Sequence, residues 1–221
     1  MSTTLKAAPL APILARLLDD ADESSTALHR ELEHLTPQER AQLHQQADYR
    51  ALYHRTRDHH LAVSRDTARL LYMLARALRA HNIVEFGTSF GVSTLHLAAA
   101  LRDNGGGRLI GSEFEPSKVA RARDTIVAAG LADLVDLREG DALETLARDL
   151  PEPIDLVLLD GAKSLYPAVL SLLAPHLRPG AVIVADNADW SDDYLAIVRD
   201  PVGRYQSLAF GVDVELSVFT G

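Results

Sequence analysis

The sequence contains no cysteine, and this absence removes several kinds of chemistry at once. Disulfide bonds, thiolate nucleophiles and cysteine-ligated zinc sites all depend on that residue. A chain without cysteine also fits a reducing cytoplasm, where disulfides are rare. We therefore expect a cytoplasmic protein whose chemistry uses oxygen and nitrogen groups.

Long apolar runs are missing as well. No stretch approaches the roughly 20 apolar residues that a membrane-spanning helix needs. Near the amino terminus, Pro9, Pro12 and Arg16 interrupt the apolar residues, which is unlike a secretory signal peptide. The sequence therefore predicts a soluble protein with no membrane partner.

Positive charge is scarce. Asp and Glu number 31 against 22 Lys and Arg, which gives a formal net charge of −9. Proteins held to nucleic acid by phosphate contacts usually carry a basic face, and here the basic residues are scattered. We therefore expect a small-molecule partner and no nucleic acid.

The composition that remains is that of an ordinary globular protein. The chain has 221 residues, of which 47% are hydrophobic and 24% are charged. This length suits one α/β domain with a full core and is too short for two large domains.

The first part of the chain has the periodicity of helices. Leucines recur at helical spacing near the amino terminus, and Ser24 or Ser25 is placed to cap a second helix. Thr36 is followed by the proline and the acid that are typical of another helix start. Ser64 precedes a further amphipathic segment.

From residue 83 onward, short apolar runs alternate with helical stretches. The apolar runs lie at 83–86, 108–112, 135–138, 154–159 and 181–185, and the helical stretches at 92–101, 117–129, 142–150 and 165–177. Such repeated units predict parallel strands buried between helix layers. Two β-rich runs, 205–210 and 212–219, follow as in a hairpin. We treat residues 1–60 as an N-terminal helical extension of the same domain and residues 61–221 as its core.

A glycine turn follows the first predicted strand. Glu85 stands at the end of that strand, and Gly87 and Gly91 come before the next helix. Glycines let the backbone approach a ligand, and a carboxylate in this crevice suits the ammonium of S-adenosylmethionine (SAM) better than a pyrophosphate. Ser89 stands where a dinucleotide-binding turn has its second glycine, which also disfavours NAD. The simpler alternative is a plain strand-to-helix turn.

Acids also follow the second and third predicted strands. Glu113 is placed to accept hydrogen bonds from ribose hydroxyls, whereas Glu115 fits the first turn of the next helix. Asp141 and Ala142 follow the third strand, where an acid and a small residue suit an adenine. For each acid the alternative is a helix cap without a ligand.

The ends of the fourth and fifth strands carry a further group of polar residues. Asp160 follows one strand, and Asp186 and Asn187 follow the other. Adjacent parallel strands end about 5 Å apart, so these side chains should converge, and their oxygens suit Mg²⁺. Lys163 lies in the same loop as Asp160 and is placed to act as a base. The alternative is that the acids cap helices and that Lys163 is a solvated charge.

Two other features have less specific interpretations. His54, His59 and His60 cluster in sequence, and we interpret them as surface or pocket-rim residues rather than metal ligands. Trp190 either lines the substrate pocket or packs against the next helix.

Taken in order, these motifs resemble those of the catechol and caffeoyl-CoA type O-methyltransferases. Residues 85–93 with Glu113 look like that family's cofactor motifs, and Asp160, Lys163 and the pair 186–187 look like its metal-and-base set. The resemblance covers roughly residues 61–188. The segment after Asn187 is shorter than that family's substrate loop.

The resemblance implies a Rossmann-like, seven-stranded methyltransferase sheet, mostly parallel with an antiparallel last strand. It also implies methyl transfer from SAM to a small phenolic or catechol-like acceptor beside a divalent cation, with Mg²⁺ expected. Asp160, Asp186 and Asn187 would hold the metal, and Lys163 with Asp160 would be catalytic. The implied cofactor-binding residues are Val63, Glu85, Gly87, Ser89, Ser93, Glu113, Asp141, Ala142 and Asp160.

Two other functions stay open at this point. One is a catalytically silent SAM-binding or assembly protein, and the other is a nicotinamide-dependent oxidoreductase. We expect residues 1–60 to shape the acceptor pocket or a dimer interface without holding cofactor. A homodimer is expected because helical N-terminal extensions often pair subunits.

Overall fold

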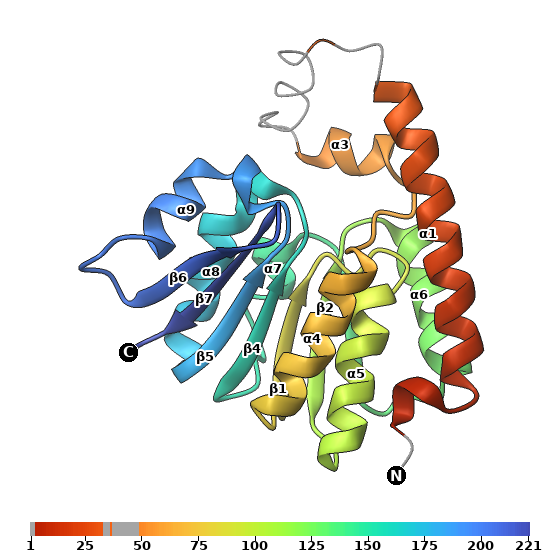
Figure 1. Ribbon diagram of the computed structural model, residues 1–221, viewed down its shortest axis with the longest axis horizontal. Helices are drawn as coiled ribbons and strands as arrows, with labels where there is room; N and C mark the ends of the chain where they lie inside the picture. The colour runs from red at the N-terminus through yellow and green to blue at the C-terminus, as the bar shows by residue number, and fades with distance from the viewer. Residues whose placement is uncertain (1–2, 33–35, 37–48) are drawn as a thin grey trace.

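A seven-stranded sheet runs through the structure, a computed structural model that describes residues 3–32, 36 and 49–221. The strands are β1 (Asn82–Phe86), β2 (Arg108–Glu113), β3 (Val135–Glu139), β4 (Ile154–Leu159), β5 (Leu177–Ala185), β6 (Tyr205–Phe210) and β7 (Val214–Phe219). Their order across the sheet is β3-β2-β1-β4-β5-β7-β6 (Figure 1). Pairs among β1 to β5 are parallel, and β7 is antiparallel to both neighbours. The predicted fold class is confirmed.

Helices cover both faces of the sheet (Figure 1). One layer contains α1 (Leu10–Leu32), α4 (Arg65–Ala77), α5 (Val92–Asn104) and α6 (Pro116–Ala128). The other contains α7 (Ala142–Thr145), α8 (Tyr166–Leu173) and α9 (Asp192–Val198). The remaining elements are α3 (Tyr49–Arg55) and the 3₁₀ turns η1 (Thr4–Lys6), η2 (Lys163–Leu165), η3 (Ala174–His176) and η4 (Ala188–Trp190).

Successive side chains of each strand pack on opposite faces of the sheet and so belong to two separate hydrophobic clusters. In β4, Leu156 and Leu158 pack in the cluster below α4 and α5, while Val157 and Leu159 pack in the cluster below α8. All four side chains are fully buried. This two-sided burial explains why the parallel strands appear in the sequence as continuous apolar runs.

The N-terminal helices differ from the prediction in one respect. The expected break at Ser24 or Ser25 is wrong, because α1 continues through both residues. The Ser24 hydroxyl accepts a hydrogen bond from the backbone N–H of His60 at 2.8 Å instead of capping a helix. Ser64 does cap α4, where its hydroxyl accepts from the Thr67 N–H at 3.0 Å. The helix start expected at Thr36 lies largely outside the described residues.

Two predicted helices are shorter than their periodicity suggested. The stretch 142–150 is helical only to Thr145, and the chain then leaves the helix and reaches a positive φ of 49° at Asp149. The stretch 165–177 is α-helical to Leu173, and Pro175 then lies in η3, where it has no N–H to continue the ladder.

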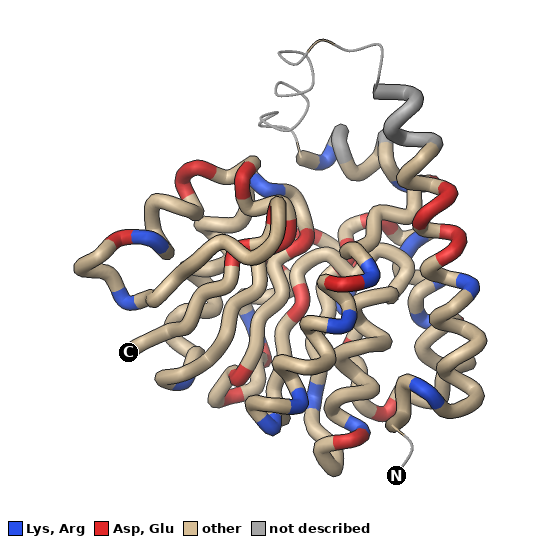
Figure 2. The backbone as a smooth tube through the Cα atoms, in the orientation of Figure 1, with Lys and Arg blue, Asp and Glu red and all other residues tan. Residues whose placement is uncertain are grey.

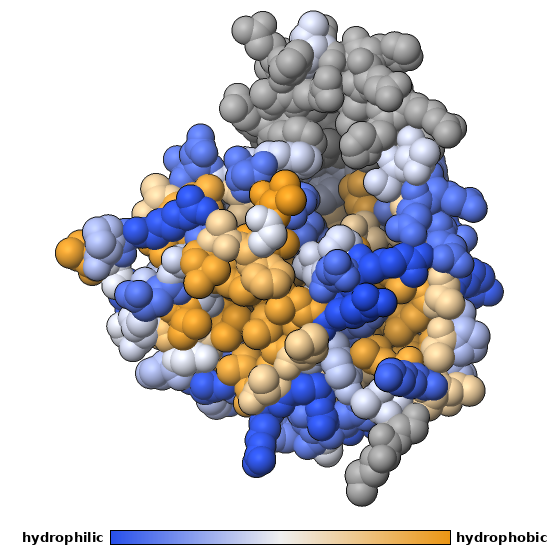
Figure 3. All heavy atoms as spheres, viewed as in Figure 1, coloured by the Kyte–Doolittle hydropathy of each residue, from blue (hydrophilic) through white to orange (hydrophobic). Residues whose placement is uncertain are grey.

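None of the described helices covers β6 and β7 on the face that carries α4. Leu208, Phe210 and Val218 lie on the same face as α4 and are 60%, 44% and 40% exposed. Figure 3 shows apolar surface gathered over this part of the sheet. Among the described residues, no helix is long and apolar enough to cross a bilayer.

The packing predicts that substitutions at two positions of α4 differ sharply in their effect on the free energy of unfolding. Leu71 is fully buried, whereas Met73 is 63% exposed. Leu71→Ala should lower the free energy of unfolding by about 2–5 kcal/mol, because it removes buried methyl groups and leaves a cavity. Met73→Ala should change it by less than about 0.5 kcal/mol. Urea denaturation measures both, and equal effects would contradict the packing described.

Candidate functional site

The carboxyl ends of the parallel strands border a crevice with two hollows that share Gly87. The first hollow is lined by Tyr49, Tyr53, Phe86, Gly87, Ser112, Glu113, Phe114, Gly140, Asp141, Ala142 and Leu165. The second hollow is lined by His60, Leu61, Ala62, Gly87, Thr88, Ser89, Phe90, Val92, Ser93 and Asp160. Open α/β sheets bind ligands at this edge. Figure 2 shows that acidic positions gather where the parallel strands end.

Gly87 brings the two sides of the crevice together. Its φ is +97°, and a Cβ there would lie 2.4 Å from the carbonyl oxygen of Asp160. Only glycine allows this approach without displacing the backbone that follows β4. The Asp160 N–H donates to the Phe86 carbonyl at 2.8 Å, which fixes the same contact from the other direction.

Glu85 braces the turn through its carboxylate, and its role in holding the cofactor stays a prediction. Its carboxylate is fully buried and accepts hydrogen bonds from Thr88, Ser93 and Thr94 at 2.8, 2.6 and 2.6 Å. Burial raises the pKa of Glu85 to about 7, although the three hydroxyls oppose this shift. The sequence analysis missed Thr88 and Thr94, whose alignment with Glu85 depends on the path of the turn.

Glu113 holds the same turn from β2. One carboxylate oxygen accepts from the Ser89 N–H at 2.7 Å, and the other accepts from the Glu115 N–H at 2.9 Å. Ser89 has a positive φ of 48°, and no described residue forms a hydrogen bond with its buried hydroxyl. Glu113 also lines the first hollow, and its role as a ribose ligand stays a prediction.

Asp141 joins the core to α3. Its side chain caps α7 by accepting from the Leu143 N–H at 3.0 Å, and it also accepts from the Tyr49 hydroxyl at 2.5 Å and from Arg50 at 3.2 Å. Burial acts to raise the pKa of Asp141, but these hydrogen bonds outweigh it and hold the pKa below its usual value. Ala142 is buried beside it in the first hollow.

Aromatic side chains close the first hollow. Tyr53 of α3 stacks on Phe114, with ring centroids 5.2 Å apart and an interplanar angle of 20°. Its hydroxyl accepts from the Ala162 N–H at 2.9 Å. The sequence analysis missed Tyr49, Tyr53 and Phe114, although two tyrosines four residues apart share a helix face. Part of the N-terminal extension therefore lies against the residues expected to hold adenosine.

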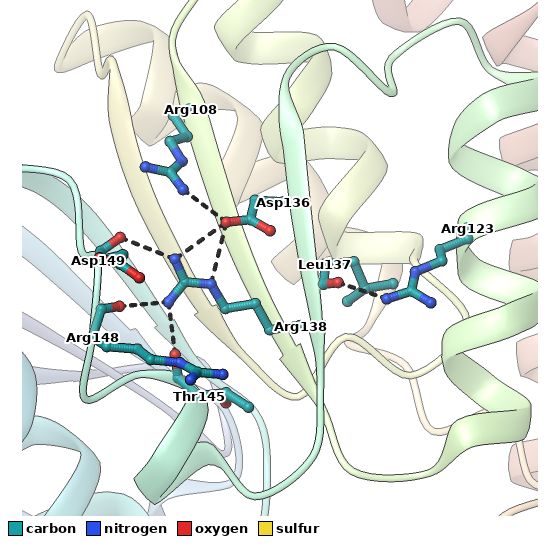
Figure 4. A network of polar contacts seen from close by, with 8 residues as sticks. All are labelled: Arg108, Arg123, Asp136, Leu137, Arg138, Thr145, Arg148 and Asp149. Atoms are coloured by element: carbon teal, nitrogen blue, oxygen red, sulfur yellow. Dashed lines mark hydrogen bonds and ion pairs between the residues drawn. The ribbon is translucent and has the colours of Figure 1, made fainter.

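Arg138 fixes the loop that follows α7 (Figure 4). Its guanidinium donates to the carbonyls of Thr145, Arg148 and Asp149 at 2.7, 2.6 and 2.9 Å. It also donates to the Asp136 carboxylate at 3.2 Å. A longer helix would use the Thr145 carbonyl itself, so this network stabilises the loop in which α7 ends.

Part of the predicted polar group after β4 and β5 lies together. Lys163 Nζ lies 3.2 Å from Asp160 Oδ1, and both side chains are largely buried. The Asp186 N–H donates to the Leu159 carbonyl at 2.9 Å, which sets the end of β5 beside that of β4. Burial, reinforced by the charge of Asp160, raises the pKa of Asp186 to about 8. Burial likewise raises the pKa of Asp160, and Lys163 opposes that shift.

Asn187 follows Asp186 in the left-handed region, with φ of 48°. Its side-chain N–H donates to Asp213 at 3.1 Å, so the β6–β7 turn also reaches the site. Sequence reasoning missed Asp213, because a turn so far along the chain gave no local signal. Within the described ranges, no three or more His, Asp or Glu side chains group as a metal site.

The remaining predicted residues take separate places. Val63 is buried in the core beside the residues that line the second hollow. His54 Nδ1 lies 3.8 Å from Glu115, whereas His60 stacks on Phe90, so these two histidines do not meet. Trp190 is 45% exposed.

The sheet order, the strand-end crevice and the buried acids on successive strands define a methyltransferase-like α/β protein. Residues 84–188 match the family model described as a methyltransferase domain. A catechol O-methyltransferase from Niastella koreensis is 38% identical over 58% of this chain and 58% of its own length. The chain thus spans less than two thirds of that relative.

Two solved structures are similar over more of their length. An O-methyltransferase from Bacillus cereus in complex with S-adenosylhomocysteine (SAH) has a TM-score of 0.67 and 25% identity, covering 88% of this chain and 97% of that one. The O-methyltransferase TomG from Streptomyces achromogenes, involved in tomaymycin synthesis and bound to SAM, has a TM-score of 0.65 and 28% identity, covering 89% and 96%. These matches confirm the predicted resemblance.

The buried Glu85 predicts a pH effect on stability. Its folded pKa of about 7 exceeds the ordinary value of 4.5, so the folded state holds this proton more tightly between those pH values. Ionisation therefore costs stability as pH rises through that window, by on the order of 3 kcal/mol in total. Glu85→Gln does not ionise and should not lose this stability. The free energy of unfolding of the variant minus that of wild type should therefore rise from pH 4.5 to 7 and stay constant above pH 7. Urea titrations that give a constant difference would contradict the assignment.

Proposed function

We propose that the protein is a SAM-dependent O-methyltransferase that acts on a hydroxyl of a small phenolic or catechol-like acceptor, with a divalent cation. One observation carries the proposal: Asp160, Lys163 and Asp186 converge beside the second hollow, next to the turn that Glu85 braces. The names of the catechol-type relative and the SAM- and SAH-bound structures support it. In this assignment the first hollow takes the adenosine and the second takes the methionine portion.

The residues present fit a hard cation. Asp186 is only 7% exposed, and its carboxylate accepts no hydrogen bond from any described residue. Two buried carboxylates repel each other, and a cation between them removes that cost. Asn187 donates its N–H to Asp213, which leaves its carbonyl oxygen to join Asp160 and Asp186 as a ligand. A cation here would supply positive charge that makes a nearby hydroxyl more acidic.

Lys163 then has a defined part in the reaction. Its ammonium is held at Asp160 and lies 5.2 Å from the centre of the Tyr166 ring, so its position is fixed. In the proposed reaction, Lys163 first releases its proton to solvent, its amine then takes the proton of the acceptor's hydroxyl, and Asp160 stabilises the ammonium that forms again. The oxygen forms a bond to the methyl carbon while the bond from that carbon to the sulfonium sulfur breaks, leaving SAH. The chain's main contribution is to align these atoms.

Two rival functions give different results. A catalytically silent SAM-binding protein would bind SAH and methylate no acceptor, and a nicotinamide-dependent oxidoreductase would bind NADH instead of SAH. A homodimer and a cytoplasmic location also stay predictions. The exposed side chains of Leu208, Phe210 and Val218 are compatible with a subunit contact, which light scattering would test.

Glu113 provides the test of cofactor binding. Glu113→Gln removes the charge that faces the ribose and should weaken SAH binding by roughly 1.5–3 kcal/mol, the scale of a charge-assisted hydrogen bond. The control is Glu139→Gln, an exposed residue paired with Glu113 across β2 and β3. Calorimetry with unchanged affinity in Glu113→Gln would reject the ribose role, and tight NADH binding without SAH binding would reject the proposed function.

Asp186 and Lys163 provide the test of chemistry. Asp186→Asn should abolish metal-dependent turnover while SAH affinity stays nearly intact, because Asp186 holds no part of the nucleoside. Lys163→Ala should lower kcat more than it raises KM, since proton removal belongs to the transition state. The assay uses a panel of catechols and phenols with Mg²⁺, and Asp192→Asn, at an exposed position, is the matched control. Full activity in excess EDTA would remove the cation from the mechanism.

A further inference from the structure

The backbone at Lys163 is held by two side chains from distant parts of the chain. The N–H of the preceding residue, Ala162, donates to the Tyr53 hydroxyl of α3 at 2.9 Å. The carbonyl of Lys163 itself accepts from the Ser191 hydroxyl at 2.8 Å. Tyr53 and Ala162 are 109 residues apart, and Ser191 and Lys163 are 28 apart. We call these two contacts the Lys163 clamp.

The Ser191 hydroxyl does not take the partner that its position in the chain predicts. Ser191 is the N-cap of α9, where a serine usually accepts a hydrogen bond from a backbone N–H of the helix. Here the side chain caps no N–H of α9 and donates to the Lys163 carbonyl instead. Ser191 is only 7% exposed, so this contact forms away from competing water. The hydroxyl therefore serves the loop that contains Lys163 and not its own helix.

The Tyr53 hydroxyl is fixed in a similar way. Its ring stacks on Phe114, which holds the hydroxyl end toward the loop after β4. Ala162 precedes η2 and has only a methyl side chain, so it cannot cap this turn itself. Ala162 is 4% exposed, and loss of the Tyr53 hydroxyl would leave its N–H without this partner in a dry environment.

The clamp bears on the position of the Lys163 amine. Nζ lies 3.2 Å from Asp160 Oδ1, at the end of a side chain that starts from the clamped backbone. A displacement of about 1 Å at a reacting group can slow a reaction on the order of 100-fold. The backbone contacts of residues 162 and 163 therefore matter for the reaction even though they lie outside the ion pair.

We propose that Tyr53 and Ser191 are positioning residues of the reaction, which place the Lys163 amine by holding the backbone around it. The inference rests on the proposed function, in which Lys163 takes the proton of the acceptor's hydroxyl. Each hydroxyl acts through the loop and not on the cofactor. Its loss should therefore slow the chemical step and leave cofactor affinity unchanged.

The experiment removes each hydroxyl and keeps the surrounding packing. Tyr53→Phe retains the ring on Phe114, and Ser191→Ala retains the small side chain before α9. Each should lower kcat about 3- to 10-fold, while KM for the acceptor and Kd for SAH change less than about twofold. The acceptor is the catechol or phenol that wild type methylates fastest with Mg²⁺.

Tyr72→Phe is the matched control for the loss of a tyrosine hydroxyl. The Tyr72 hydroxyl donates to Asp103 at 2.6 Å, and neither residue lines a hollow. This variant should leave kcat, KM and SAH affinity unchanged.

A double variant tests whether the clamp acts through the lysine. In the Lys163→Ala background, Tyr53→Phe should lower kcat by less than about twofold, because the group that it positions is absent. Unchanged kcat in both single variants, a loss of SAH affinity as large as the loss of kcat, or an undiminished further loss in the Lys163→Ala background would overturn the inference. If wild type bound no SAH or methylated no acceptor of the panel, the proposed function itself would fall, and this inference with it.

Discussion

The close approach of the β1 turn to the end of β4 is the contact on which the site depends. Gly87 leaves no space for a side chain against the Asp160 carbonyl, and Gly161 likewise leaves none against the Phe86 ring, which a Cβ would meet at 2.3 Å. With the two backbones in contact, the cofactor turn and the residues after β4 share one crevice. Every other part of the site is positioned relative to this junction.

Burial of carboxylates around that junction sets the electrostatics of the site. Glu85, Asp160 and Asp186 all lose water on folding, and burial raises the pKa of each. Different groups offset the cost of burying each carboxylate. Three hydroxyls donate hydrogen bonds to Glu85, and Lys163 faces Asp160. No described side chain donates a hydrogen bond to the Asp186 carboxylate, and the charge of Lys163 offsets only part of its burial, so an external positive charge would stabilise this position.

The N-terminal helices contribute more to the site than a separate extension would. Tyr49 of α3 donates to Asp141, Tyr53 stacks on Phe114, and Ser24 of α1 accepts from His60. Each contact joins residues far apart in sequence, and each lies beside one of the two hollows. Cofactor binding and the packing of the first 60 residues should therefore be coupled.

The sequence by itself determined the strands, their alternation with helices and the order of the motifs. Apolar runs buried on both faces marked β1 to β5, Ser64 marked the start of α4, and strand ends put Glu113, Asp160 and Asp186 at one edge. These features follow from local periodicity and from the geometry of parallel strands.

Only the tertiary structure decided which partner each polar group takes. Glu85 turned toward three hydroxyls, Ser24 toward His60, and Asn187 toward Asp213 in a distant turn. The loop after α7 is held by Arg138, which donates to the carbonyls of Thr145, Arg148 and Asp149. The contact of Tyr53 with Ala162 likewise has no local signal, because hydrogen-bond partners and desolvation depend on residues that meet only when the chain has folded.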